Sequence, residues 1–137
     1  MELAKEAVAG GVWFRQLRPG KQIALQPKDE PQKLLFGAAK QMQNYIYLVG
    51  CSATRECYAI DASWDVDGIA AYAKRHRMRL VGALGTHFHF DHIGGEVPEY
   101  MRAMVYGPFG APKGEVPRTC GLKEMGTDHG CKVRLCR

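Results

Sequence analysis

Residues 57–92 follow a strand–helix–strand pattern whose second strand ends in a cluster of histidines, and few folds accommodate it. The run "CYAID" at 57–61 is typical of a short strand, and apolar residues then recur at helical spacing through 65–78. The run at 80–89 is mostly apolar and long enough for a buried strand. A helix that joins two such strands places them in parallel through a right-handed crossover. We therefore expect an α/β fold, with the histidines at the carboxyl edge of the sheet, where open α/β sheets commonly bind ligands.

The other segments extend this α/β layer and complete a single domain over residues 1–137. Strand propensity, turn residues and helix-end signals predict them in chain order. They are strands at 11–17 and 21–27, a loop at 27–33, a hairpin at 44–62, a short helix over 97–104 opened by Pro98, a loop at 107–117, and a helix closed by Gly130 before a last strand.

Composition and apolar runs exclude several classes of protein. Hydrophobic residues make up 46% of the chain and charged residues 24%, which suits a folded core and excludes a disordered chain. No apolar run approaches the ~20 residues that span a bilayer, so we expect no membrane association. The first eleven residues lack a secretory apolar core, which predicts a cytoplasmic location. A mitochondrial presequence over 2–9 stays open, although Glu2 and Glu6 argue against it.

The formal net charge of +5 does not by itself indicate nucleic acid. The densest basic cluster, Lys74–Arg79, ends the helical pattern, where cations offset the helix dipole. It has no interleaved aromatic residues for base stacking, so a solvated helix end is favoured over a nucleic-acid patch. We expect a surface position for His76 because it lies inside this basic cluster.

Five cysteines, an odd number without an export signal, do not indicate a disulfide framework. We expect free thiols, with a Cys51–Cys57 pair across the hairpin turn as an open alternative. A zinc site built from Cys120, Cys131, Cys136 and His129 is a second alternative, although the cysteines lack CxxC spacing.

Three of the five histidines lie within residues 87–92. If the strand continues to its end, His87 and His89 point to one face and form a chelating pair, while Phe88 and Phe90 point to the other face and are buried. Random placement would rarely put three of five histidines so close together. The alternation therefore favours a metal site over a polar loop that is merely rich in histidine.

Two further ligands follow the strand in a bend. Asp91 and His92 come directly before Gly94 and Gly95, which allow the backbone to turn sharply. Imidazole and carboxylate together suit Zn²⁺, Fe²⁺ or Mn²⁺ better than Ca²⁺ or Mg²⁺, which prefer oxygen ligands. The predicted metal ligands are His87, His89, Asp91 and His92.

The segment "THFHFDHIGG" at 86–95 resembles the H-x-H-x-D-H signature of the metallo-β-lactamase superfamily, and "YLVG" and "YAIDA" upstream resemble its strand pair. The resemblance covers residues 10–106 well and 107–137 in outline. It implies an αββα sandwich with one or two metal ions at the rim. His87 and His89 would then serve the first ion and Asp91 and His92 the second, while Asp61 would brace the loop.

The resemblance also implies a chemistry. One or two Zn²⁺ ions, with Fe²⁺ or Mn²⁺ open, would lower the pKa of a bound water to ~7 and supply hydroxide for hydrolysis of a small ester, thioester or lactone. Asp91 would be the catalytic residue that binds metal and orients the water or accepts its proton. An iron-dependent persulfide dioxygenase and a non-catalytic metal-binding fragment stay open as alternatives.

The chain departs from the family pattern after His92. The family completes its site with a histidine, an aspartate and a final histidine downstream, whereas His129 is the one histidine that follows here, in a helix-end context. We therefore expect a sandwich truncated to its N-terminal half, with impaired activity. Half a sandwich would leave an apolar sheet face uncovered, which predicts self-association.

Overall fold

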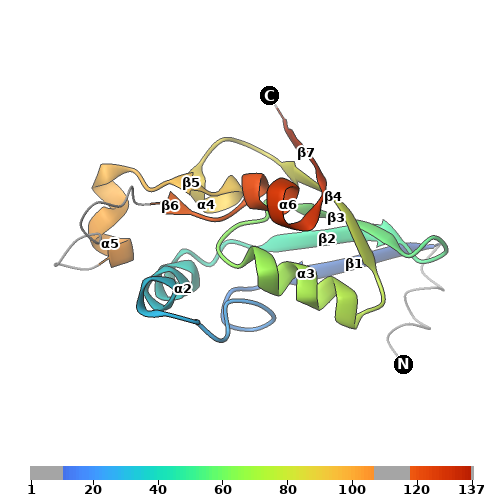
Figure 1. Ribbon diagram of the computed structural model, residues 1–137, viewed down its shortest axis with the longest axis horizontal. Helices are drawn as coiled ribbons and strands as arrows, with labels where there is room; N and C mark the ends of the chain where they lie inside the picture. Colours follow the sequence, from blue (N-terminus) through green and yellow to red (C-terminus); the bar gives the residue numbers. More distant parts are fainter. Residues whose placement is uncertain (1–10, 107–117, 137) are drawn as a thin grey trace.

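A five-stranded mixed sheet forms the centre of the computed structural model, which describes residues 11–106 and 118–136 (Figure 1). The strand order is β1-β2-β3-β4-β7, antiparallel from β1 to β3 and parallel from β3 to β7. The predicted crossover is confirmed, because helix α3 joins the parallel strands β3 and β4. The bounds are β1 Val12–Leu17, β2 Ile46–Cys51, β3 Glu56–Ile60, α3 Val66–Arg75, β4 Arg79–Gly85 and β7 Lys132–Leu135.

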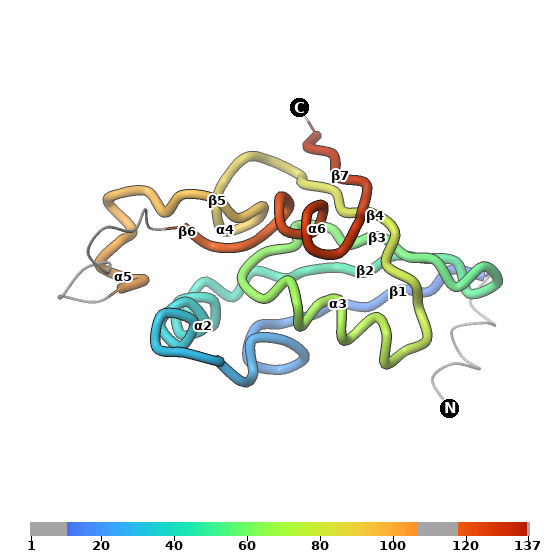
Figure 2. Tube along the Cα trace, viewed as in Figure 1, coloured from blue at the N-terminus to red at the C-terminus, as the bar shows by residue number. Residues whose placement is uncertain are grey.

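Helix α3 and helix α6 (Leu122–His129) lie side by side on one face of the sheet (Figures 1 and 2). Helix α3 begins after Asp65, whose carboxylate accepts a hydrogen bond from the backbone N–H of Gly68 at 3.0 Å. Its predicted apolar stripe is buried against the strands, which makes this face the main core. The buried side chains include Trp13, Leu17, Ile46, Leu48, Ala59, Ile69, Ala73, Ala83 and Met125.

The opposite face of the sheet presents apolar side chains to solvent. Phe14 pairs with Val49, and Val49 pairs with Tyr58, so these three side chains form one row across β1, β2 and β3. Phe14 is 50% exposed, Tyr58 is 42% exposed and Val12 on the same face is 52% exposed. We call Val12, Phe14, Val49 and Tyr58 the open sheet face.

A second apolar cluster lies at the end of the molecule that carries helix α2 (Glu30–Met42) and helix α5 (Arg102–Tyr106) (Figure 2). These two helices pack against each other. Trp64 and Phe90 meet edge to face in this cluster, with ring centroids 5.9 Å apart. The 3₁₀ turn η1 (Glu99–Met101) leads into α5, and the short strands β5 (Gly95–Glu96) and β6 (Arg118–Thr119) pair antiparallel.

Two predicted segments are wrong. Residues 21–27 form no strand, because Ala24 has a positive φ of 56° and its N–H donates to the Asp65 carboxylate at 2.8 Å instead of to a neighbouring strand. Residues 27–33 are not all loop, because α2 begins at Glu30. Asp29 accepts from the backbone N–H of Gln32 at 2.8 Å and so caps this helix.

The other predicted elements agree with the structure. The hairpin, the helix within 65–78, the short helix near 97–104 and the last helix and strand are all present, with Gly130 left-handed at the end of α6. The strand at 80–89 is shorter than predicted, since β4 ends at Gly85. The loop at 107–117 lies outside the described residues.

The predicted α/β class is confirmed, with helices on one face of a mixed sheet. None of the helices in the described residues has the length and apolarity needed to cross a bilayer. All five cysteines are free, so the Cys51–Cys57 pair is not formed.

Candidate metal centre

The histidine segment leaves the sheet as a bend and then forms the single-turn helix α4 (Phe90–Ile93). Gly94 ends this turn with a positive φ of 78°. A Cβ atom at Gly94 would lie 2.6 Å from the carbonyl carbon of Cys120, so the close approach of these two backbones requires glycine.

The bend changes the predicted alternation of side chains. Phe90 is buried as predicted. The prediction that Phe88 is buried as well is wrong, because its side chain is 75% exposed. The physical reason is that β4 ends at Gly85 and residues 86–88 bend away, so strand alternation does not reach Phe88.

The structure nevertheless brings the four predicted ligands together. The ring centroid of His87 lies 4.7 Å from that of His89 and 4.1 Å from that of His92. The Asp91 Oδ2 atom lies 3.5 Å from His92 Nε2. Three imidazoles and one carboxylate therefore share one rim of the sheet.

Asp61 supports this cluster from behind. Its carboxylate accepts from the Thr86 backbone N–H at 2.7 Å and from the Thr86 hydroxyl at 2.7 Å, and it lies 3.0 Å from His92 Nδ1. This contact favours the tautomer of His92 that keeps its proton on Nδ1 and leaves Nε2 to accept or to bind. These hydrogen bonds agree with the bracing role that the family resemblance implies for Asp61.

Asn44, which the sequence did not single out, holds Asp91. Its amide Nδ2 donates to the Asp91 carbonyl at 3.0 Å and to Asp91 Oδ2 at 2.6 Å. The Ser63 hydroxyl also donates to the Asp91 carbonyl, at 3.1 Å. No local pattern signals Asn44, because it meets Asp91 across a sequence separation of 47 residues.

The side chains do not converge on one point as a metal would require. Within 11–106 and 118–136, no group of three or more His, Cys, Asp or Glu is arranged to hold an ion. Asp91 Oδ2 faces the Asn44 amide, and His87 Nδ1 lies 3.0 Å from the Thr86 hydroxyl. The donor types still fit zinc, and a carboxylate behind one imidazole is a usual feature of zinc sites.

The alternative site of cysteines and His129 is not assembled. His129 Nε2 lies 2.9 Å from Asp67 Oδ1 of α3, so the imidazole of His129 is paired with this carboxylate instead of with the cysteines. The Cys120 thiol donates to the Trp64 carbonyl, and burial raises the pKa of Cys120 and of Cys131 above the usual value. Raised pKa values disfavour the thiolates that zinc needs.

His76, for which the sequence predicts a surface position, is half-buried at the end of α3 and makes specific contacts there. Its ring stacks on Tyr72 with centroids 4.2 Å apart, and its Nδ1 lies 2.9 Å from the Tyr72 carbonyl. These contacts give His76 a role in ending helix α3.

Comparison with known proteins finds similarity over part of the chain. This chain is 36% identical over 67 residues to a hydroxyacylglutathione hydrolase of Halorhodospira halophila. It is also 44% identical over 52 residues to a hydroxyacylglutathione hydrolase of Rhodospirillum rubrum. These matches cover 47% and 38% of this chain but only 26% and 20% of the relatives. No family model matches. A metallo-beta-lactamase structure from Staphylococcus aureus subsp. aureus COL aligns with a TM-score of 0.49 and 16% identity, over 90% of this chain and 23% of that one.

Proposed function

We propose that this chain is a metal-dependent hydrolase of the metallo-β-lactamase type that acts on small esters, thioesters or lactones. The relatives named hydroxyacylglutathione hydrolase favour a thioester within this class. The chain spans about a quarter of the length of those relatives, so the activity is proposed for the site and not transferred from them.

The contact among three imidazoles, with Asp61 behind His92, is the observation that carries the proposal. His87 and His89 would hold one zinc ion, and Asp91 and His92 would hold a second. Bound zinc supplies an activated water and polarises the carbonyl of the substrate. Fe²⁺ and Mn²⁺ accept the same donors.

The protein's own residues would set up the proton transfer. Asp91 would orient the attacking water and accept its proton at a carboxylate oxygen. Asn44 and Ser63 hold the backbone and side chain of Asp91, and Asp61 holds the ring of His92. Such positioning reduces the reorganisation that the reaction requires.

Zinc titration of the metal-free protein tests the proposal. We expect zinc at about 100 times its Kd to stabilise the fold by about 2.7 kcal/mol and to raise Tm by about 10 °C. His89→Asn should remove most of this shift, whereas His129→Asn, outside the cluster, should keep it. Hydrolysis of a hydroxyacyl thioester should require zinc and stop with EDTA.

The possible outcomes separate the readings. Turnover that persists in EDTA, or equal zinc shifts in wild type and His89→Asn, would contradict the proposal. Zinc binding without turnover would identify a non-catalytic metal-binding protein. Oxygen uptake with Fe²⁺ and a persulfide would identify an oxidoreductase.

A further inference from the structure

A pocket of about 530 Å³ opens directly beside the histidine cluster. His89 and Asp91 form part of its wall, so a molecule bound in it would touch the candidate metal ligands. Its volume lies within the range of small-molecule sites, about 300–1,000 Å³. The volume and position indicate a substrate-binding pocket.

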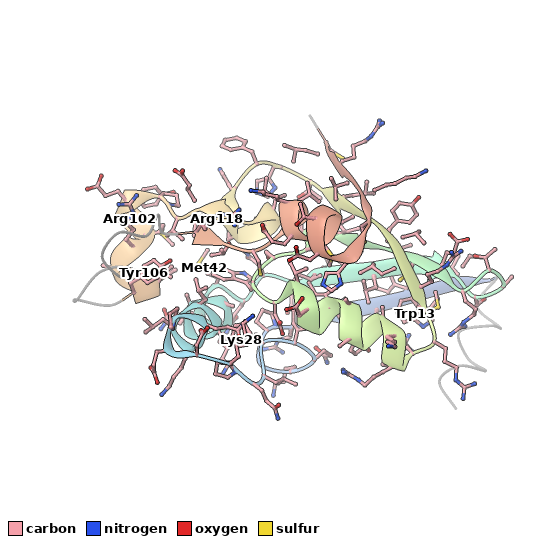
Figure 3. The ribbon with its side chains drawn as sticks, viewed as in Figure 1. Trp13, Lys28, Met42, Arg102, Tyr106 and Arg118 are labelled. Carbon is pink, nitrogen blue, oxygen red and sulfur yellow. The ribbon has the colours of Figure 1, made fainter. Side chains whose placement is uncertain are left out.

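The rest of the wall is largely apolar and comes from separate elements. Met42 projects from the end of α2 toward the segment that carries the histidines (Figure 3), and Tyr100 and Met101 come from η1. Phe88, Phe90 and Pro98 also line the pocket. Tyr100 is 84% exposed and Phe88 is 75% exposed, so both rings have free area to cover a ligand. Methionine and aromatic side chains adapt to and stack on apolar groups.

The charges around the pocket disfavour anions. Asp91 and Glu96 are the charged side chains among the described residues that line it, and no lysine or arginine of that part of the chain is among them. In the metal-free protein, a carboxylate in this pocket would meet Asp91 and Glu96, with no lysine or arginine of the described residues lining it. An uncharged group meets no such penalty.

We propose that this pocket binds the uncharged apolar acyl chain of the substrate and so sets the acyl specificity of the hydrolase. The inference rests on the proposed function, because the acyl chain belongs to the ester or thioester that the hydrolase would cleave. Binding of an uncharged chain in the pocket can still be measured without turnover. The pocket predicts a preference for longer aliphatic or aryl acyl groups over carboxyacyl groups.

Binding can be measured without turnover, using NMR titration of the metal-free protein with a series of neutral amides from butanamide to octanamide. We expect affinity to rise by about fourfold for each added methylene until the pocket is filled. Octanoate, which has the same chain and a negative charge, should bind at least tenfold more weakly than octanamide. Shifts should concentrate on Met42, Tyr100 and Met101.

Tyr100→Ser should weaken octanamide binding by about threefold to tenfold, because it removes a stacking ring from the wall. Tyr58→Ser is the matched control, since Tyr58 is a partly exposed tyrosine on the open sheet face. Equal binding of octanoate and octanamide, or equal effects of the two substitutions, would overturn the inference. Octanamide binding together with no ester or thioester hydrolysis would leave the pocket in place and refute only the proposed function.

Discussion

Asn44→Leu removes the amide that holds Asp91 and keeps a branched side chain of similar size. The amide donates to the Asp91 carboxylate at 2.6 Å and to its carbonyl at 3.0 Å. A hydrogen bond to a charged group contributes about 1.5–3 kcal/mol and one to a neutral group about 0.5–1.5 kcal/mol. In the variant, the Ser63 hydroxyl still donates to the Asp91 carbonyl, and water can reach the partly exposed Asp91. The loss of folding free energy should therefore lie near the lower end of the sum of these two ranges.

We expect Asn44→Leu to lower the free energy of unfolding of the metal-free protein by about 1.5–3 kcal/mol. Urea denaturation measures this loss, and with a slope of about 2 kcal/mol/M the midpoint should fall by about 1 M. Gln41→Leu is the control, because Gln41 is exposed on α2 and its change should stay within about 0.5 kcal/mol. Equal midpoints for the two variants would refute the reasoning that Asn44 holds Asp91.

Two further predictions concern the sheet. We propose that a second copy of the chain covers the open sheet face, so light scattering should show a mass that rises with concentration. Phe14→Lys should abolish that rise in mass, whereas the control Leu25→Lys, at an exposed site outside this face, should keep it. A wild-type protein that stays monomeric at every concentration would contradict the proposal. Burial raises the pKa of Cys57 to about 11 from 9.0, so the folded state favours the protonated thiol and stability should fall as pH rises from about 9 toward 11. The urea midpoint should fall less between pH 8 and pH 10.5 for Cys57→Ala than for the wild type. Equal falls for the two proteins would refute the role of this thiol.

The missed helix α2 shows how local signals can be read incorrectly. The polar composition of 27–33 and its two prolines favour a loop, yet Pro31 is compatible with the first turn of a helix, where its missing N–H costs nothing. Asp29 directly before that turn was the available cap signal. The strand predicted at 21–27 failed for a different reason, since the long-range bond from Ala24 to Asp65 draws this segment away from the sheet.

Sequence alone determined the features that depend on neighbours along the chain. The spacing of apolar residues and the Asp65 cap specify α3, and the crowding of three histidines into six positions keeps their rings within one short segment. The metal role of these side chains stays a prediction. Their chemical type and spacing were readable because they lie within one short segment.

Tertiary structure decided what surrounds those side chains. Asp61 reaches Thr86 because β3 and β4 run parallel with Ile60 beside Leu84, so residues that follow the two strands meet at one edge. The contact of Asn44 with Asp91 and the apolar pocket likewise join segments far apart in sequence. Such contacts depend on strand register and helix packing, which many chain segments determine together and no local pattern encodes.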